Sequence, residues 1–465
     1  MQRILVGMVV LISCLEVSAR AAEQPAVPDL AKVKVLDLKT AQAVALGGNP
    51  DMAVAQARIE QARARVRQAA ATWWPSLDAS GSGIRQHLSE NNYQYNRGLS
   101  ALVGGKTADQ NTDVYSSSIQ ATWLLFDGFY RDFRERQAIY GEQAAQAGLV
   151  DSQRMLVTAV AEAFLNAQLS QTYIDINRAD ATFYGQQLED AQNRFKVGAG
   201  PWGDVLNIRV QVNSAKTSLI RSQREFEAAG YGLAALLGLP DATFPAHLRL
   251  VALDKETALV EQKEAAEALI KEAFSIRPDI RQLEMVVKQT EAGTGMAKAP
   301  FYPKFQLAGA LEGMREGDAR LTNDDFGNTV GVNMSWNLYA GGADKARVVE
   351  AEQAKREAVF ALAGLRNNVA AEIRQDLAML AASREQVRLQ RETVKLVEEN
   401  RDLARNEYEA GEASLVRLNE AQRDLVTTHG RLAQALVGYH LAQQRLLAAT
   451  GRNLAGFERP SKERK

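Results

Sequence analysis

The residue types that most often carry catalysis or bind metals are few and scattered in this chain of 465 residues. Its four histidines, His87, His247, His429 and His440, show no metal-ligand spacing, and Cys14 is the single cysteine. The nine methionines are also scattered, so they do not indicate a soft-metal site. Neither a nucleotide-binding loop nor a catalytic triad is visible. We therefore expect a protein that is not an enzyme and that needs no metal or other cofactor.

The overall charge argues against nucleic acid as a partner. The chain has 55 basic and 56 acidic residues, and no basic stretch stands out. A nucleic-acid-binding domain normally carries a concentrated basic surface. Length alone would allow two or three domains.

The N-terminal segment 1–21 has the features of a secretory signal peptide. Arg3 supplies the positive start, residues 4–15 form an apolar run, and Ala19-Arg20-Ala21 is a small-x-small cleavage site. Leu11-Ile12-Ser13-Cys14 is also similar to the lipobox of bacterial lipoproteins, which would make Cys14 a lipidated N-terminus. The sequence favours cleavage after Ala21, and lipidation stays open. No later apolar run is long enough for a transmembrane helix, so we expect export beyond the inner membrane.

An internal duplication organises the rest of the chain. Phe-Asp-Gly at 126–128, a Gly-containing break at 193–198 and Leu-Leu-Gly at 236–238 mark the first half. Similar landmarks recur in the second half at 339–341, 406–411 and 449–451, all displaced by the same offset. Landmarks repeated at one offset over such a span indicate two copies of one structural unit.

The segments between these landmarks are predicted to be very long helices. Proline is absent between Lys304 and Arg459, and Ala, Glu, Gln, Arg and Leu, which favour helices, dominate. One apolar stripe with steps of three and four positions consists of Leu362, Leu365, Val369, Ile373, Leu377 and Leu380. A continuous helix from Ala343 to Ala410 would be about 100 Å long. A coiled-coil scaffold would share this feature.

Shorter helices precede each half and end at an aromatic-proline junction. Asn49-Pro50 and Arg277-Pro278 are predicted helix starts. The junctions, Trp73-Trp74-Pro75 and Phe301-Tyr302-Pro303, are separated by the same offset as the two helix starts. Paired aromatics there fit a membrane interface, although buried core aromatics are the alternative. The predicted interface aromatics are Trp73, Trp74, Trp123, Phe301, Tyr302 and Trp336.

After each junction the sequence alternates with the period of a β-strand. Residues 114–125 and 329–338 show the clearest alternation, and polar loops over about 87–113 and 313–326 join the strands of each pair. A strand of about ten residues is long enough to cross a bilayer when tilted. Four strands cannot close a barrel, and open edges are not tolerated in lipid. The chain is therefore expected to assemble with copies of itself, giving eight strands from two chains or twelve from three.

These signals divide the chain into ten segments. They are a signal peptide at 1–21, an extended lead-in at 22–37, first-repeat helices at 38–74, a first transmembrane hairpin at 75–126, first long helices with a mid-helix break at 127–238, a linker at 239–263, second-repeat helices at 264–302, a second hairpin at 303–339, second long helices with a mid-helix break at 340–451, and a polar, disordered tail at 452–465. The resemblance described next implies that the two breaks are periplasmic tips.

The order and spacing of these features resemble the TolC family of outer-membrane efflux and secretion channels. The resemblance covers about residues 36–451 and rests on the duplicated halves, the helix starts, the aromatic-proline junctions and the mid-helix breaks. It implies a mostly α fold with a small transmembrane β part: a homotrimer with a twelve-stranded β-barrel and a periplasmic α-helical barrel. It also implies passive conduction across the outer membrane of a Gram-negative bacterium, with a periplasmic adaptor protein, an inner-membrane pump and outer-membrane lipid as partners.

The resemblance also implies two functional sites. The adaptor-docking tips would consist of Val197, Gly198, Ala199, Gly200, Ala410, Gly411, Glu412 and Ala413, although the glycines could be helix caps only. The gate would involve a hydrogen bond between Asp204 and Tyr408. Arg417 and Glu420 replace the acidic constriction pair, and because they are spaced i, i+3 on one helix we expect them to neutralise each other in part.

Three functions are compatible with the sequence. The first is an efflux duct for drugs, small molecules or metal ions. The second keeps the architecture but exports proteins or peptides as part of a type I secretion system. The third is a periplasmic coiled-coil scaffold without a pore. The residues of a wide polar tunnel do not encode the cargo in the way that a pocket does.

Overall fold

The computed structural model describes residues 33–104, 109–245, 248–261 and 264–457. The predicted signal peptide, Cys14 and the first part of the lead-in lie outside these residues. The chain divides into two compact units. The first comprises the described residues up to Asn49 together with Ala159–Asp254, and the second comprises Pro50–Thr158 and the described residues from Lys255 onward.

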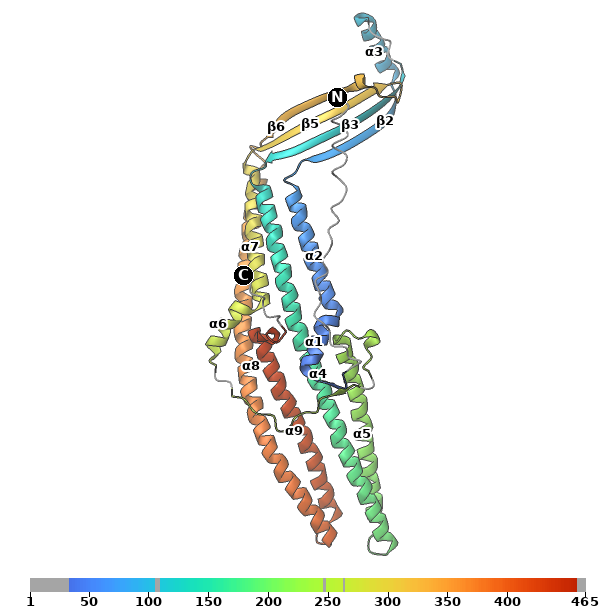
Figure 1. Cartoon of the computed structure of the whole chain (residues 1–465), viewed down its shortest axis with the longest axis vertical. Helices are drawn as coiled ribbons and strands as arrows, with labels where there is room; N and C mark the ends of the chain where they lie inside the picture. The colour runs from blue at the N-terminus through green and yellow to red at the C-terminus, as the bar shows by residue number, and fades with distance from the viewer. Residues whose placement is uncertain (1–32, 105–108, 246–247, 262–263, 458–465) are drawn as a thin grey trace. The chain divides into compact units, whose positions relative to one another are not determined.

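The first unit contains the C-terminal part of one long helix and its antiparallel partner (Figure 1). Its elements are β1 (Val35–Leu36), α1 (Leu38–Gly48), the second part of α4 (Tyr130–Lys196), α5 (Trp202–Leu236), η2 (Pro240–Ala242) and β4 (Arg249–Leu250). β1, from the predicted lead-in, and β4, from the predicted linker, form a two-stranded parallel sheet. The Asn49 side chain donates a hydrogen bond to Leu236 O at 2.9 Å and so connects the end of α1 to the end of α5.

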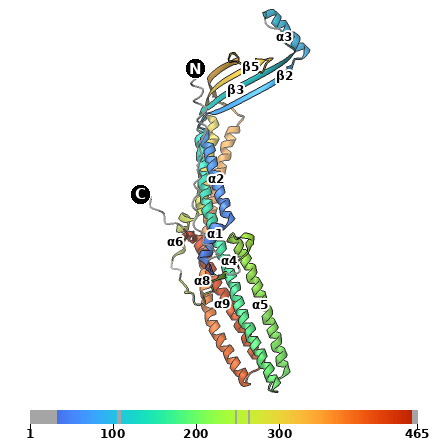
Figure 2. The same cartoon turned by 45° about the vertical axis from the view of Figure 1, so that its right-hand side comes forward.

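The second unit contains both hairpins and the second pair of long helices (Figures 1 and 2). Its elements are α2 (Pro50–Ala71), β2 (Ser76–His87), α3 (Glu90–Val103), β3 (Asn111–Phe126), the first part of α4, α6 (Ala266–Ile276), α7 (Pro278–Lys298), η3 (Ala299–Phe301), β5 (Lys304–Glu316), η4 (Asn323–Asp325), β6 (Phe326–Ser335), α8 (Ala343–Ala410), α9 (Leu415–Thr450) and η5 (Arg452–Leu454).

The long helices confirm the sequence prediction. α4 has 67 residues and α8 has 68, and α8 begins and ends at the predicted residues. At the α-helical rise each is about 100 Å long. Val369, Ile373 and Leu380 of the predicted stripe are buried, and the other three stripe residues are half-buried. The stripe therefore belongs to the surface with which α8 packs on its neighbours α7 and α9. No helix in the described ranges has an apolar stretch that could cross a lipid bilayer.

Glycine ends the long helices where the chain reverses. Gly198 follows α4 with a φ of 74°, and Gly411 follows α8 with a φ of 82°. The N–H of Gly411 bonds back to Tyr408 O at 3.1 Å. A left-handed residue at this position satisfies carbonyl groups at a helix end, and glycine adopts it without steric cost. Both glycines therefore cap their helices in the left-handed conformation.

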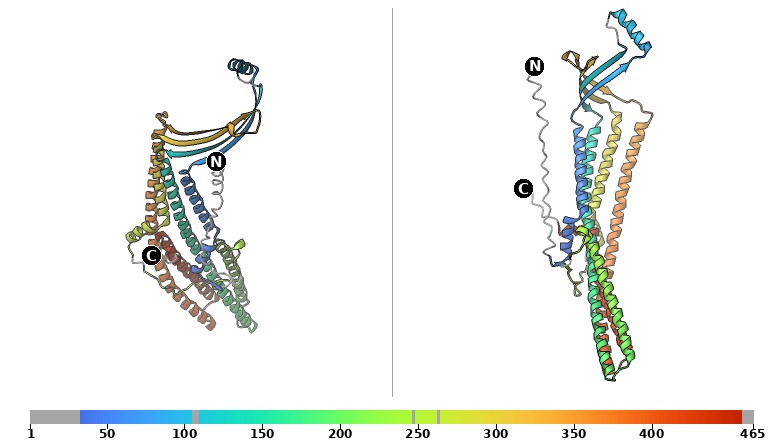
Figure 3. Two further views of the ribbon diagram at one scale, coloured as in Figure 1. Left: turned by 45° about the horizontal axis from the view of Figure 1, so that its top comes forward. Right: turned by 90° about the vertical axis from the view of Figure 1, so that its right-hand side faces the viewer.

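The four long strands form one antiparallel sheet in the order β2-β3-β5-β6 (Figure 3). The register pairs Ser80 with Ser118, Ser118 with Glu312, and Glu312 with Gly327. Because side chains alternate along a strand, residues of one pairing row share a face. We call the two faces the polar face and the apolar face.

The polar face is rich in hydroxyl, amide and carboxylate groups. Its polar residues between the two ends of the sheet are Ser76, Asp78, Ser80, Ser82, Ser116, Ser118, Gln120, Thr122, Gln306, Glu312, Thr329 and Asn333. The apolar face includes Leu77, Ala79, Ile119, Ala121, Trp123, Leu307, Leu311, Val330, Val332 and Met334. The sheet is therefore amphipathic, as the alternation predicted.

Three features differ from the sequence expectations. The first predicted loop contains helix α3, whose apolar residues Tyr95, Leu99 and Leu102 have helical spacing that its Asn-rich start obscured. β6 ends at Ser335, before the predicted Leu338, because β5 begins at Lys304 and offers no further ladder partner. Residues 452–457 are ordered, since Arg452 bonds Glu272 and the first tail residues pack against the helices.

Candidate functional site

The first aromatic-proline junction is held by a cluster of polar contacts. The Trp73 indole donates a hydrogen bond to a Glu135 carboxylate oxygen at 2.9 Å, and the Arg131 guanidinium lies 4.4 Å from the Trp73 ring centroid. Arg131 is itself buried and forms an ion pair with Asp127 at 3.3 Å. The Trp123 indole donates to Trp73 O at 2.9 Å. Together these contacts fix the chain where α2 passes into β2.

The hydrogen bond from a tryptophan indole to a backbone oxygen recurs at the second junction. The Trp336 indole donates to Phe301 O at 3.2 Å, and the Tyr302 ring packs edge-on against Phe129 with centroids 5.9 Å apart. Trp123 and Trp336 are separated by the same number of residues as Gly128 and Gly341. Trp73 and Phe301 are separated by the same number as Pro50 and Pro278. The structure thus brings together the six predicted interface aromatics at the helix-to-strand junctions, and all six are exposed. Their placement at a membrane surface stays a prediction.

A tight turn accompanies the first junction. Gly128 has a φ of 72°, and a Cβ at this position would lie 2.5 Å from Ala299 O and 2.9 Å from Tyr302 Cβ. Gly341, its counterpart in the second repeat, has a φ of 62° and nothing within 4 Å of such a Cβ. The sequence identified both glycines, but only the structure distinguishes the crowded one from the open one.

The first tip, in the first unit, is an exposed apolar turn. Val197, Gly198 and Ala199 are exposed, and Gly200 is half-buried. The Phe195 and Trp202 rings on either side of the turn lie 5.0 Å apart, centroid to centroid. The predicted docking residues of this tip are therefore accessible to a partner.

The second tip, in the second unit, is polar. Ala410, Gly411 and Glu412 are exposed, and Ala413 is half-buried. Ser414 caps α9 by accepting from the N–H of Arg417. The two tips thus match in backbone but differ in side-chain chemistry.

The predicted gate residues belong to different elements of the chain. Asp204 lies in the first turn of α5 in the first unit, and Tyr408 lies in the last turn of α8 in the second unit. Their hydrogen bond stays a prediction. The ion pair of Arg417 is with Glu407 across the turn, at 3.2 Å, rather than with the expected Glu420, which is exposed. Arg417 therefore neutralises a residue on the neighbouring helix instead of one on its own.

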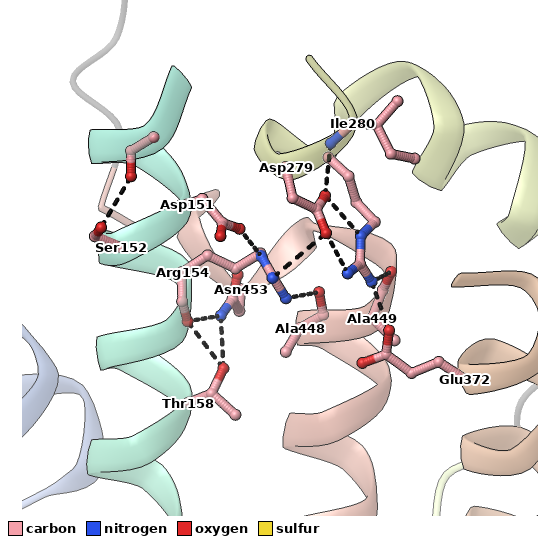
Figure 4. A network of polar contacts seen from close by, with 12 residues as sticks. Asp151, Ser152, Arg154, Thr158, Asp279, Ile280, Glu372, Ala448, Ala449 and Asn453 are labelled. Atoms are coloured by element: carbon pink, nitrogen blue, oxygen red, sulfur yellow. Dashed lines mark hydrogen bonds and ion pairs between the residues drawn. The ribbon is translucent and has the colours of Figure 1, made fainter. Parts of the chain in front are cut away.

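A buried charged network links α4, α7, α8 and the end of α9, and sequence reasoning missed it (Figure 4). Arg277 donates two hydrogen bonds to the Asp279 carboxylate, at 2.7 and 3.1 Å, and one each to Glu372 and Ala449 O. Arg154 donates to Ala448 O at 3.2 Å. Two guanidinium groups therefore satisfy carbonyls at the C-terminus of α9, where the helix dipole favours positive charge.

The network also changes the ionisation of its carboxyl groups. Burial alone would raise the pKa of Asp279, but hydrogen bonds and charge from Arg277 and Arg154 hold it below the ordinary value. Burial and the charge of Glu372 raise the pKa of the nearby Asp376 to about 6. The only sequence signal for this network was the Arg277-Pro278-Asp279 motif. From the sequence alone, that motif indicates only the start of a helix.

The second part of the predicted linker lies across α8 and α9. Arg391 donates to Thr257 O at 2.9 Å, and the Val260 N–H donates to the Tyr439 hydroxyl at 2.9 Å. Tyr439 is fully buried, and Gln443 donates to the same hydroxyl. This segment of the linker therefore connects the two helices well away from their tip.

Within the described ranges, no group of three or more His, Cys, Asp or Glu side chains is arranged to hold a metal ion.

Comparison with known proteins identifies the architecture. The chain is 26% identical over 401 residues to nodulation protein T of Rhizobium leguminosarum bv. trifolii, covering 83% of this chain and 79% of the relative. It is 25% identical over 400 residues to the probable efflux pump outer membrane protein TtgC of Pseudomonas putida, covering 86% and 78%. It is 24% identical over 422 residues to the cation efflux system protein CusC of Escherichia coli K12, covering 88% and 84%.

Solved structures show the same fold. The Campylobacter jejuni CmeC outer membrane channel matches with a TM-score of 0.76 at 18% identity, covering 90% of this chain and 86% of that one. The outer membrane protein VceC of Vibrio cholerae matches with a TM-score of 0.72 at 20% identity, covering 89% and 96%. The model of the family described as outer membrane efflux protein matches residues 43–239 and 269–452. The chain therefore belongs to the outer membrane efflux protein family, a family of outer-membrane channels with periplasmic extensions.

Proposed function

We propose that this protein is the outer-membrane duct of a tripartite efflux system and conducts its cargo passively. The observation that carries the proposal is the direct connection of an amphipathic four-stranded sheet to helices of about 100 Å. A sheet of this kind suits a bilayer, and helices of that length suit the periplasm. The energy for transport would come from an inner-membrane pump.

The sheet supports assembly into a trimer. β2 and β6 are its two edges, and an open edge in lipid leaves backbone groups without hydrogen bonds. Joining β6 of one copy to β2 of the next removes the edges, and three copies give a closed barrel of twelve strands. Extraction of the outer membrane with detergent tests this assembly. We expect a compact trimer, and a soluble periplasmic monomer would contradict the channel.

The tips are the proposed docking surface for a periplasmic adaptor. A photo-crosslinking residue at Ala199 in living cells, followed by mass spectrometry, would identify the captured partner. We expect an adaptor of a small-molecule or cation pump. The same crosslinker at Asp318, in the turn after β5, serves as the control and is expected to capture no adaptor.

The identity of the captured protein decides the cargo class. Relatives are named for cation, toluene and antibiotic efflux, which supports a small-molecule or cation cargo for this chain. Capture of the adaptor of an ATP-driven protein exporter would overturn the efflux assignment. Capture of no adaptor from Ala199 would overturn the docking role of the tip.

A further inference from the structure

The charged residues of the polar face are unevenly distributed along the sheet. Asp78 pairs with Gln120, and Glu312 pairs with Ser118, so the two carboxylates lie in consecutive rows of the polar face. Glu316 lies further toward the α3 end of the same face, while Lys304 lies at the opposite end, beside the helices. All three carboxyl side chains are exposed.

The charge of these carboxylates is not neutralised by neighbouring side chains. Within the described residues no ion pair involves Asp78, Glu312 or Glu316, and the Asp78 carboxylate accepts a hydrogen bond from the Ser76 hydroxyl at 3.3 Å. The basic side chains Arg85 and Arg315 belong to the other face, where they pair with Asp113 and Asp325. The polar face therefore carries a net negative charge between Ser76 and Glu316.

The orientation of the sheet decides what this charge can do. In a membrane barrel the apolar face contacts lipid and the polar face lines water. The apolar face here, with Ile119, Leu307 and Val332, fits lipid, so the polar face would line the pore. Charges that line an aqueous path with low-dielectric walls concentrate ions of the opposite sign within about one Debye length of the wall, roughly 10 Å at 0.1 M salt.

We infer that Asp78 and Glu312 give the strand-lined part of the channel a preference for cations over anions. The inference rests on the proposed function, since it needs the assembled barrel, in which each carboxylate occurs once per copy. At the second tip the charges of Arg417 and Glu407 cancel, because the two form an ion pair. The strand-lined preference is therefore assigned to Asp78 and Glu312 as a contribution separate from that of the predicted constriction.

Planar-bilayer recordings of the purified full-length assembly test the inference. The reversal potential in a KCl gradient gives the permeability ratio of potassium to chloride. At about 0.1 M salt we expect the wild type to favour potassium, and the double variant Asp78→Asn/Glu312→Gln to lose at least about threefold in this ratio. At about 1 M salt, where the Debye length falls to roughly 3 Å, the difference should shrink.

Two further variants sharpen the result. Asp318→Asn removes the same charge from the turn after β5 and is the matched control, with no change expected. Thr329→Asp adds a carboxylate to the row of Asp78 and should raise the ratio. An unchanged ratio in the double variant, or an equal fall in the control, would overturn the inference. A wild type that forms no channel would overturn the proposed function as well.

Discussion

The indole N–H of Trp123 donates a hydrogen bond to the backbone oxygen of Trp73 at 2.9 Å and thereby ties β3 to the junction where α2 ends. Trp336 and Phe301 make the same contact in the second repeat at 3.2 Å. The same hydrogen bond from a tryptophan indole to a backbone carbonyl therefore occurs in both repeats, although the loops between the strands of the two hairpins differ in length. The contact is therefore part of the repeated architecture rather than of one loop.

This pair predicts matched effects of two substitutions. Trp123→Phe and Trp336→Phe each remove one hydrogen bond but keep an aromatic ring, so each should destabilise its junction by about 1 kcal/mol. The thermal midpoint of the detergent-purified assembly measures the effect. Trp74→Phe is the control, because the Trp74 side chain is 77% exposed and its indole has no hydrogen bond in the described part of the chain. An equal loss in the control would show a general tryptophan effect.

The duplicated glycines give a second prediction. Gly128→Ala places a methyl group 2.5 Å from Ala299 O, so the turn must shift and the yield of folded assembly should fall sharply. Gly341→Ala has the same left-handed backbone but open space, so its cost is limited to backbone strain of about 1 kcal/mol. Semi-native gel electrophoresis of outer membranes compares the two yields. Equal yields would contradict the assignment of crowding to Gly128.

The buried network predicts a large effect at Arg277. Arg277→Met leaves the half-buried Asp279 without its bidentate partner and should cost roughly 3 kcal/mol. Arg277→Lys should restore only part of the stability, because an ammonium group cannot make the forked contact. Thermal unfolding measures both variants. Arg388→Met removes two exposed ion pairs on α8 and should be nearly silent, so a comparable loss there would refute the special role of burial.

The raised pKa of Asp376 predicts that the free energy of unfolding depends on pH. Its folded pKa of about 6 lies above the ordinary 3.8, so between these values the folded protein binds a proton that the unfolded chain does not. Stability should therefore rise as the pH falls from about 7 to 4. Because the side chain is half exposed, we expect a contribution of only about 1 kcal/mol. Asp376→Asn should raise the thermal midpoint at pH 7.5, and the difference should vanish near pH 4. A pH-independent difference would contradict this origin.

The second tip gives a prediction about charge. Arg417→Asp removes the partner of Glu407 and adds a carboxylate, so the channel should become more cation-selective if this residue lies at the constriction. Reversal potentials measure the change. An unchanged preference would remove Arg417 from the constriction.

Much of the fold was determined by the sequence alone. Helix periodicity in α8, strand alternation in β3 and β6, and proline after each aromatic pair are local signals, and they are repeated at fixed offsets. Local signals of this kind depend on backbone preferences and on which face is apolar, both of which can be inferred from neighbouring residues. The predicted tip turns at Gly198 and Gly411 follow from the same logic.

Tertiary structure decided the rest. Arg154 bonds Ala448, and Arg277 bonds Ala449, although each pair is far apart in the sequence, and no local pattern specifies such partners. The pairing of Arg417 with Glu407 depends on how the turn folds back, and the end of β6 depends on where β5 begins. The sequence by itself therefore determined the long helices and the long strands and their order, although not helix α3. Only the folded chain decided which charges are buried and paired, because that depends on which distant segments pack together.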